Sequence, residues 1–600
     1  MITLGINAAF HDSAAVIVVD GELVAAAEEE RFTRIKHGKR PLPFTAWELP
    51  FNAIDFCLER AGINLVDVDH VAYSYDPRRF LRQHGIGATI SLPLEPSAQP
   101  AAERKGWDNP WDPLFAAYIV NAPRQLASGA PHHLQKRFAG ARHDGPYRFH
   151  FIDHHLSHQA SAFLASPFDH CAVMTLDGRG EETTTSYGVY RHDAYEPIGE
   201  VLMPHSLGLL YERITSHLGF LHSSDEYKVM ALAALGKPVY EGLLREHVKV
   251  TGDGHYVILP LDLSTLFGPP RERGAPMAQC HFDLAASLQA VLEDTVLQLG
   301  TWLREVSGER RLAMAGGVAL NCVMNARLRD SGIFDEVWVQ PAAGDAGTAL
   351  GAALWIDARE RHKAVPAPAA LLAPKSDAGQ LAPRRWQMTH AYLGPEFSDE
   401  EIEAFLTWAK LPYQVLHDPE QATARLLADG KVIGWFQGRM EFGPRALGGR
   451  SILASPLQAE MQARLNELKD REDFRPVAPA VTQEAMAEWF TPADANGGRS
   501  PFMLFIYDVQ PGQADRIPAA CHTDRTARIQ TVTAETHPRY HGLIKAFGEL
   551  TGVPVLINTS FNVRGEPVVC TPKDAINAFH STPIDALVIG RCLLLKESTT

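Results

Sequence analysis

The sequence predicts a duplicated α/β domain followed by a smaller α+β domain. Two strand-turn-strand patterns indicate the duplication, one turning at Asp20-Gly21 and the other ending its first strand at Asp177-Gly178. An Ala/Pro-rich stretch then separates the two patterns from a C-terminal part in which helical and β-rich runs alternate. The chain therefore reads as two folded parts joined by a linker.

The first repeat opens with a short strand over residues 2–6, followed by AAVIVV, the Asp-Gly pair and ELVAAA. Asp-Gly between two β-rich runs is a strong hairpin signal. A similar order recurs in CAVMTLDGRGEETTTSYGVY, although two unrelated hairpins would give the same pattern. In a duplicated domain, the turn after each first strand points backbone N–H groups at the phosphates of a bound nucleotide.

Composition limits the classes of function. The chain has 600 residues and a net charge of -15, which argues against nucleic acid as a partner. Its seven cysteines are scattered without a CxxC pair, so we expect a reducing, cytoplasmic setting. Neither a basic leader nor an apolar run of about eighteen residues occurs, so we expect no export and no membrane span. The oligomeric state stays open, a homodimer included.

The domain boundaries follow from breaks in composition. The helical ALGAALWIDARERH precedes AVPAPAALLAPKSDAGQLAPRR, so we expect a first domain over 1–363, a linker over 364–385 and a second domain over 386–600. Ser398 followed by Glu401 predicts a capping box at the first helix of the second domain. The Pro- and Trp-bearing GWDNPWDP lies in an expected insertion at about 83–145, where we place an acceptor-specific element.

A metal-binding group is the sharpest prediction for the first domain. His154 and His158 are spaced i and i+4, which puts both imidazoles on one face of a helix. Asp177 ends a strand and Asp345 precedes a helix, and both positions face the expected cleft. Two imidazoles and two carboxylates suit iron(II), manganese or zinc. The alternatives are core or capping histidines and turn or N-cap aspartates.

Other polar residues are expected at the same cleft. His11 follows the first strand and can orient or deprotonate an attacking hydroxyl, with Lys36 nearby; its alternative is a turn histidine bonded to backbone. The Gly-Gly of AGGVALN allows close backbone approach to a nucleoside or phosphate, whereas Asp225 and Lys228 also suit a solvated helix start. The candidate nucleotide-binding residues are Asp12, Gly178, Asp225, Lys228, Gly316, Gly317 and Asn321.

The second domain holds a crowded basic segment. Seven arginine and lysine residues occur between Arg439 and Arg475, on a stretch rich in Gly and Pro. Guanidinium groups bind phosphate in a bidentate manner, although pairing with nearby glutamates and aspartates on a surface loop is the alternative. HTDRTARIQTV and VPVLINTSFN add polar groups at strand ends that suit a planar carbamoyl group beside a phosphate. The candidates are Arg445, Arg450, Lys469, Arg475, His522, Arg528, Asn558 and Ser560.

These motifs, in this order, closely resemble the NodU/CmcH family of O-carbamoyltransferases. The resemblance rests on FHDSAAVIVVDG, EEERFTR, HHLSHQASAF, LDGRGEE, DEYKVMALA, AGGVALN, GDAGTALGAAL, FGPRALGGRSILA, DFRPVAPAV, ARIQTV and PVLINTSFN, and it covers nearly the whole chain. It implies an N-terminal domain of the ASKHA fold and a C-terminal YrdC-like domain. The segment around Trp107 to Trp111 matches nothing in the family pattern.

The resemblance also implies a reaction in two stages. Carbamoyl phosphate and ATP, with Mg²⁺, give carbamoyl-adenylate in the C-terminal domain. The N-terminal domain then transfers the carbamoyl group to a hydroxyl of a small-molecule natural product, with Fe(II) favoured as the metal and His11 and Lys36 as catalytic residues. The alternatives are an ASKHA-fold kinase and a non-catalytic ATP-switch protein, neither of which would need carbamoyl phosphate.

Overall fold

The computed structural model describes residues 1–38, 49–79, 119–128, 146–364, 379–491 and 498–596. Contacts divide the chain into two compact units. The N-terminal unit comprises Met1–Glu226, Pro238–Leu320 and Ser331–Met388. The C-terminal unit comprises Tyr227–Lys237, Asn321–Asp330 and Thr389–Thr600. Two short segments that lie in sequence between parts of the N-terminal unit therefore belong to the second unit.

Two five-stranded sheets form the N-terminal unit. The first has the order β3 (Glu22–Glu28), β2 (Ala14–Val19), β1 (Ile2–Asn7), β4 (His70–Tyr73) and β5 (Arg148–Phe151). The second has the order β8 (Ala194–Leu202), β7 (Thr183–Arg191), β6 (His170–Leu176), β11 (Arg311–Ala315) and β12 (Glu336–Val339). In each sheet three antiparallel strands lie next to two that continue it in parallel. The duplicated α/β fold is confirmed.

The expected hairpin is present at the first turn. β2 pairs antiparallel with β3, and Asp20 and Gly21 adopt φ values of 50° and 87°. Both values are positive, which a two-residue turn of this kind requires and which Asp-Gly adopts readily. The Asp-Gly turn therefore joins β2 to β3, whose register shifts between Ile17 and Val18.

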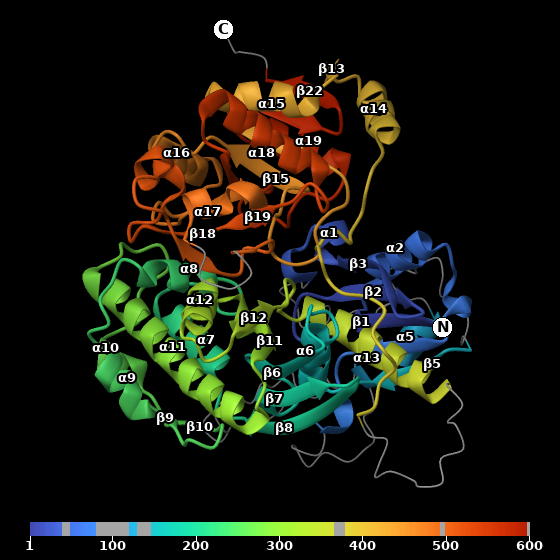
Figure 1. The fold of residues 1–600 in the computed structure, drawn as a ribbon, viewed down its shortest axis with the longest axis vertical. Coiled ribbons are helices and arrows are strands. Elements are labelled where there is room, and N and C mark those ends of the chain that lie inside the picture. The colour runs from blue at the N-terminus through green and yellow to red at the C-terminus, as the bar shows by residue number, and fades with distance from the viewer. Residues whose placement is uncertain (39–48, 80–118, 129–145, 365–378, 492–497, 597–600) are drawn as a thin grey trace. The chain divides into compact units, whose positions relative to one another are not determined.

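Two helices lie at the centre of the N-terminal unit (Figure 1). α6 (His154–Phe163) follows β5, and α13 (Ala346–Ala364) follows β12, so the two helices occupy corresponding places in the two repeats. They pack directly on each other, and α13 also covers β1 and β2. Gly351 allows this approach, because a Cβ atom there would lie 1.7 Å from the carbonyl oxygen of Ser157.

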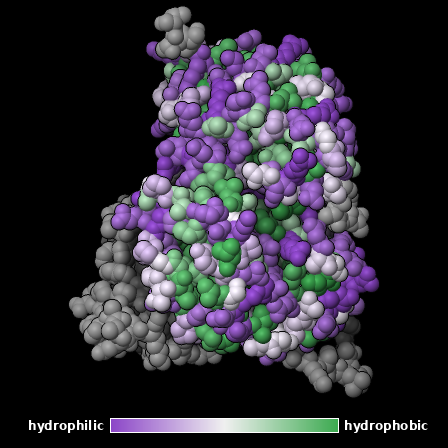
Figure 2. All heavy atoms as spheres, turned by 90° about the vertical axis from the view of Figure 1, so that its left-hand side faces the viewer, coloured by the Kyte–Doolittle hydropathy of each residue, from purple (hydrophilic) through white to green (hydrophobic). Residues whose placement is uncertain are grey.

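The remaining elements of the N-terminal unit surround the sheets. They are α1 (Glu30–Thr33), α2 (Phe51–Ala61), α5 (Ala122–Ser128), α7 (Leu207–His217), α9 (Glu241–His247), β9 (Val248–Val250), β10 (Tyr256–Ile258), α10 (Leu263–Phe267) and α11 (Gln279–Ser307). The face drawn in Figure 2 mixes hydrophobic and hydrophilic side chains. Val239 and Leu243 of this unit are exposed large hydrophobic residues. No helix among the described residues is long and apolar enough to cross a bilayer.

The C-terminal unit is built on one mixed eight-stranded sheet. Its order is β13 (Gln414–Val415), β22 (Cys592–Leu595), β21 (Ala586–Ile589), β14 (Ile433–Phe436), β15 (Arg450–Ala454), β20 (Val555–Ser560), β16 (Ala478–Thr482) and β19 (Gln530–Val532). Its helices are α14 (Asp399–Trp408), α15 (Pro419–Ala428), α16 (Glu460–Leu468), α17 (Met486–Trp489), α18 (Pro538–Thr551) and α19 (Pro572–Ser581). A hairpin of β17 (Ile506–Asp508) and β18 (Thr526–Arg528) completes this α+β unit.

The capping box predicted from Ser398 and Glu401 is present at the start of α14. Ser398 caps α14 by accepting a hydrogen bond from the backbone N–H of Glu401, and the Glu401 side chain accepts one from the Ser398 N–H. The described residues of the C-terminal unit also include α8 (Glu226–Ala233), except Glu226, and α12 (Cys322–Asp330). Within this unit, Asn325 of α12 donates a hydrogen bond to the Leu504 carbonyl.

Two predicted segments fall largely outside the described residues. Of the expected insertion at about 83–145, the structure describes only 119–128, so the stretch from Trp107 to Trp111 is not included. Of the expected linker at 364–385, residues 365–378 are likewise outside.

The close packing of α6 on α13 makes a testable prediction. Gly351→Ala should lower the free energy of unfolding by about 1 to 3 kcal/mol, because the added methyl overlaps the backbone of α6. Thermal or urea unfolding of the purified protein measures this change. Gly242→Ala in α9 is the matched control, since its Cβ meets no atom within 4 Å and should leave stability equal or slightly higher. If Gly351→Ala were as stable as Gly242→Ala, the close packing of α6 on α13 would be contradicted.

Candidate metal centre and anion site

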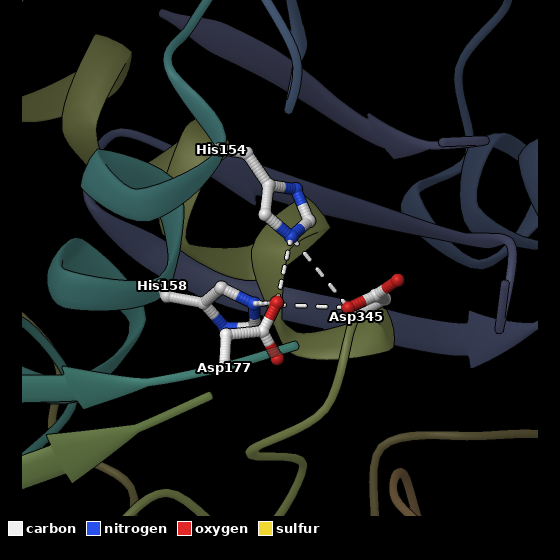
Figure 3. Close-up of side chains that lie close together, drawn as sticks. All are labelled: His154, His158, Asp177 and Asp345. Carbon is white, nitrogen blue, oxygen red and sulfur yellow. Dashed lines mark ion pairs between the residues drawn. The ribbon is translucent and has the colours of Figure 1, made fainter. Parts of the chain in front are cut away.

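His154 and His158 lie side by side on α6, as their spacing predicts (Figure 3). Asp153 caps the helix by accepting a hydrogen bond from the backbone N–H of Leu156 at 2.9 Å. Because the helix begins directly after the strand β5, its first turn is placed at the end of the sheet. Both imidazoles are completely buried.

Asp177 and Asp345 complete a four-residue group (Figure 3). Asp177 follows β6, and Asp345 precedes α13. The Nε2 atom of His154 lies 3.6 Å from a carboxylate oxygen of each aspartate, and the Nε2 atom of His158 lies 3.9 Å and 3.7 Å from the same oxygens. Four ligands about 2.1 Å from one ion stand about 3.4 Å apart in a tetrahedron, so these separations suit a small cation.

Neighbouring backbone groups orient two of the four side chains, His154 and Asp177. The Nδ1–H of His154 donates to the carbonyl of Ser74 at 3.2 Å, which leaves Nε2 as its ligand atom. The N–H of Gly317 donates to Oδ1 of Asp177 at 2.7 Å, so Oδ2 is the oxygen that faces the histidines. Partners of this kind fix the tautomer and direction of metal ligands.

The electrostatics of the group also suit a cation. Burial lowers the pKa of His154, but the nearby carboxylates of Asp177 and Asp345 outweigh it and raise that pKa well above its usual range. Burial raises the pKa of Asp345, but His11, His154 and His158 close to its carboxylate hold that pKa well below its usual range. Among the described residues, Nε2 of His154 and both nitrogens of His158 are buried without a hydrogen-bond partner. Two imidazoles and two carboxylates fit a divalent transition metal.

A second cluster, His11, Asp12 and His37, lies at the turn after β1. Asp12 contacts both imidazoles, and Nε2 of His11 lies 4.0 Å from Oδ2 of Asp345. Lys36 precedes His37 in the short 3-10 helix Lys36–Gly38. The turn after β1 therefore lies next to the four-residue group. Of the two predicted catalytic residues, His11 is the one with a short distance to that group.

The predicted nucleotide-binding residues divide between the two units. Asp12, Gly178, Asp225, Gly316 and Gly317 belong to the N-terminal unit.

Two of these residues make close backbone contacts. Gly316 has a φ of 95°, and a Cβ there would lie 2.2 Å from the Leu176 carbonyl oxygen, so this position needs glycine. Oδ2 of Asp225 accepts the N–H of Leu221 at 3.2 Å.

Lys228 and Asn321 belong to the C-terminal unit. Lys228 pairs with Glu472 at 2.9 Å, and Asn321 accepts a hydrogen bond from the N–H of Met324 at the start of α12. The segment that carries Lys228 therefore contacts Glu472, which lies between Arg471 and Arg475 in the sequence.

Four arginines concentrate positive charge in the C-terminal unit: Arg445, Arg471, Arg475 and Arg528. Burial, followed by the charges of Arg528 and Arg475, lowers the pKa of Arg445 to about 9. Burial and the same two neighbours lower the pKa of Arg471 to about 9. Among the described atoms, Nη2 of Arg471 and Nε of Arg528 are buried without a hydrogen-bond partner. Mutual repulsion of this kind is relieved by a bound anion.

Other predicted residues lie at the end of β20. Lys469 donates hydrogen bonds to Oγ of Ser560 at 3.0 Å and to Oδ1 of Asn562 at 2.8 Å. The Asn558 amide donates to the Ala446 carbonyl at 3.1 Å, beside Arg445. The strand end and the arginine-bearing loop are thus in direct contact.

His522 lies near Arg528. Burial, opposed by Asp524 and supported by Arg528, lowers the pKa of His522 to about 4, so the imidazole is neutral at physiological pH. Its Nδ1 lies 3.0 Å from Oγ1 of Thr526.

Arg450 differs from the other predicted arginines. It is completely buried at the start of β15, and its guanidinium donates to the carbonyls of Gln437, Gly438, Gly449 and Pro395. The same group lies 3.6 Å from the ring centre of Phe436. Arg450 therefore holds the Gly-rich loop together.

Sequence reasoning assigned no role to Arg471 or Tyr227. Arg471 lies in the basic segment between Lys469 and Arg475, so charge crowding was the signal available. The ring of Tyr227 lies 4.6 Å from the guanidinium of Arg475. Its place in the C-terminal unit depends on tertiary contacts of α8, for which the sequence carries no local signal.

Comparison with known proteins identifies the family. Residues 2–128 and 141–354 match a model described as the carbamoyltransferase N-terminus, and residues 424–596 match the carbamoyltransferase C-terminus. The chain belongs to the carbamoyltransferase family. As the resemblance implied, it is a transferase enzyme that joins an N-terminal to a C-terminal carbamoyltransferase domain.

Several curated proteins are similar over most of their length. Nodulation protein NolNO of Sinorhizobium fredii is 37% identical, over 99% of this chain and 80% of its own. The uncharacterized protein sll1178 of Synechocystis is 39% identical, over 99% and 97%. Nodulation protein U of Rhizobium fredii is 27% identical, over 92% and 89%.

Replacing one imidazole should empty the metal centre. His158→Ala should lose bound transition metal, because it removes one of the four convergent ligands. Metal content of the purified protein, measured by mass spectrometry, checks this. His255→Ala is the control, since that side chain is 49% exposed and remote in sequence from the group. Wild type without transition metal, or unchanged content in His158→Ala, would contradict the site.

Metal affinity should rise with pH. The raised pKa of His154 means that the metal-free group holds a proton at neutral pH, and a metal must displace that proton. Affinity should then increase by roughly tenfold per pH unit for each proton released, up to the pH at which His154 deprotonates by itself. Calorimetric titration in buffers of different ionisation enthalpy measures the released proton; no proton release would contradict this.

Arg450 should affect stability more than binding. Arg450→Met leaves four carbonyl groups without their donor and should lower the free energy of unfolding by about 3 kcal/mol or more. Urea unfolding measures the loss. Arg425→Met, on the exposed surface of α15, should leave stability unchanged. Full stability with loss of substrate binding would instead assign Arg450 to the anion site.

Proposed function

We propose that the protein is an ATP-dependent O-carbamoyltransferase that works in two half-reactions. The C-terminal unit forms carbamoyl-adenylate, and the N-terminal unit transfers its carbamoyl group to a hydroxyl of a small-molecule acceptor. The observation that supports this most directly is the coexistence of a buried arginine cluster and a separate metal-ligand group in a member of the carbamoyltransferase family.

The first half-reaction needs several phosphate groups to be bound at once. Carbamoyl phosphate would be hydrolysed to carbamate and phosphate, and a carbamate oxygen would attack the α-phosphorus of ATP, with pyrophosphate leaving. Arg445, Arg475 and Arg528 supply guanidinium groups for this charge, and Mg²⁺ would accompany ATP. Arg471, which the sequence analysis did not select, adds a fourth guanidinium group.

Lys469, Asn558 and Ser560 would hold the small planar group beside the phosphates. They combine an ammonium, an amide and a hydroxyl at one strand end. His522, neutral at physiological pH, can accept or donate a hydrogen bond there without adding charge.

The second half-reaction would take place at the turn and helix ends of the N-terminal unit. His154, His158, Asp177 and Asp345 would hold the metal, for which we favour Fe(II). When bound, such an ion polarises a carbonyl oxygen as a Lewis acid. His11 would take the proton of the acceptor hydroxyl at Nε2, and Lys36 would supply positive charge to the leaving AMP. The acceptor oxygen forms the new bond to carbon as the bond from carbon to the adenylate oxygen breaks.

The N-terminal unit would also contact the adenosine part of the intermediate. Asp12, Gly178, Gly316 and Gly317 lie at the turns beside the metal ligands, where backbone N–H groups are close. The scattered cysteines support a cytoplasmic location.

An acceptor-free assay tests this proposal. The protein is incubated with ATP, Mg²⁺ and carbamoyl phosphate, and carbamoyl-adenylate, AMP and pyrophosphate are followed by mass spectrometry. Wild type should form the adenylate only with carbamoyl phosphate, and Arg475→Ala should reduce formation by about 100-fold, as loss of a charge-stabilising group does. Arg425→Ala, exposed on α15, should match wild type. ATP turnover that ignores carbamoyl phosphate would favour a kinase or ATP switch.

A further inference from the structure

Four side chains of the N-terminal unit form a continuous chain of hydrogen bonds. Nδ1 of His11 lies 2.9 Å from Oδ2 of Asp12, and Nδ1 of His37 lies 2.8 Å from the other oxygen, Oδ1. Nε2 of His37 lies 3.1 Å from Oγ of Ser224. A single carboxylate therefore joins two imidazoles. The sequence pattern placed His37 near the same cleft as His11 but did not predict that Asp12 would connect them.

The backbone holds this arrangement firmly. The N–H of Asp12 donates to the His37 carbonyl at 3.0 Å, and the N–H of His37 donates to Oε2 of Glu30 at 2.6 Å. Phe10, Asp12 and His37 have φ values of 54°, 52° and 64°, a region that residues other than glycine rarely adopt. Backbone held in such regions is concentrated at functional sites.

The chemistry of these side chains decides which imidazole nitrogens carry a proton. An ionised carboxylate can only accept hydrogen bonds, so both imidazoles must donate their Nδ1–H to Asp12. Burial raises the pKa of Asp12, but the two histidines outweigh it and keep that pKa far below its usual range. His11 then carries its lone pair on Nε2, the nitrogen 4.0 Å from Asp345 at the edge of the metal centre.

We propose that His37 is a positioning residue, which through Asp12 holds His11 in the tautomer and orientation that present Nε2 to the acceptor hydroxyl. This inference rests on the proposed function, in which His11 accepts that hydroxyl's proton. The proton moves to Nε2 as the oxygen–carbon bond forms, AMP leaves, and the imidazolium then returns the proton to solvent. A base oriented by a carboxylate is a common catalytic pattern, and here a second imidazole orients the carboxylate.

The tautomer can be measured without any substrate. In the full-length protein labelled with ¹⁵N-histidine, the His11 signals are assigned by their loss in His11→Gln. At alkaline pH, wild type should show His11 protonated at Nδ1 and unprotonated at Nε2. Asp12→Asn should reverse the tautomer of one of the two imidazoles, His11 or His37, because the amide can accept a hydrogen bond from only one Nδ1–H and donates to the other ring. Protonation of wild-type His11 at Nε2 would overturn the proposal.

Kinetics test the role of His37 itself, with glycerol as the probe hydroxyl and glyceryl carbamate as the product. His37→Ala should lower kcat for transfer by about 10- to 100-fold, the size of effect expected for a supporting residue, with KM for glycerol unchanged. His37→Gln should recover most of kcat, because its amide N–H can also donate to Asp12. His222→Ala, whose side chain is 69% exposed, should match wild type.

Several outcomes separate the positioning role of His37 from a structural role and from a role in metal binding. An equal loss of adenylate formation in His37→Ala, or no recovery in His37→Gln, would assign His37 a merely structural role and overturn the proposal. A second bound metal that His37→Ala removes would overturn it too, since His11, Asp12 and His37 would then be ligands. If wild type forms no carbamoyl-adenylate or no glyceryl carbamate, the proposed function fails in that assay, and the ¹⁵N measurement still decides the arrangement.

Discussion

The packing of α6 on α13 is the constraint on which the N-terminal site depends. Each helix follows a parallel strand of its own sheet; α6 carries His154 and His158, and Asp345 directly precedes α13. Gly351 lets the two backbones touch, so the distance between His154 and Asp345 is set by main-chain contact and varies little with side-chain choice. The turn that carries His11 is placed by β1, against which α13 also packs.

The C-terminal unit buries several positive charges close together. Two of its arginines have a depressed pKa because burial and neighbouring guanidiniums both oppose the charged form. Arg450 satisfies its charge with backbone carbonyls and shapes the loop. One segment thus contains both a structural arginine and repelling ones, and only the latter gain from a phosphate.

Much of the fold could be predicted from the sequence, because the signals were local. Asp20-Gly21 specified a hairpin, the i and i+4 histidines specified one helical face, and Ser398 with Glu401 specified a cap. The predicted set His154, His158, Asp177 and Asp345 comes together in space.

What escaped prediction depends on contacts between distant segments. Tyr227 and Asn321 lie in the C-terminal unit although most of their neighbours in sequence do not. The contact between His37 and Asp12 needs a backbone turn with positive φ at both residues. Asp and His adopt such φ values more often than most residues, but too rarely for the residue type to predict the turn. The backbone environment of Arg450 could not be told from that of Arg445, since both follow the same Gly-rich pattern.

The spread of the metal ligands along the chain has a consequence for biosynthesis. His154 and His158 leave the ribosome almost two hundred residues before Asp345, and Asp345 can join them only when α13 has formed. Nascent N-terminal repeats would therefore expose a helix face with two imidazoles during translation, with Asp177 at the end of β6. A long-range closure of this kind is slow compared with local helix formation, so the four-residue group is complete only at the last stage of folding of the unit.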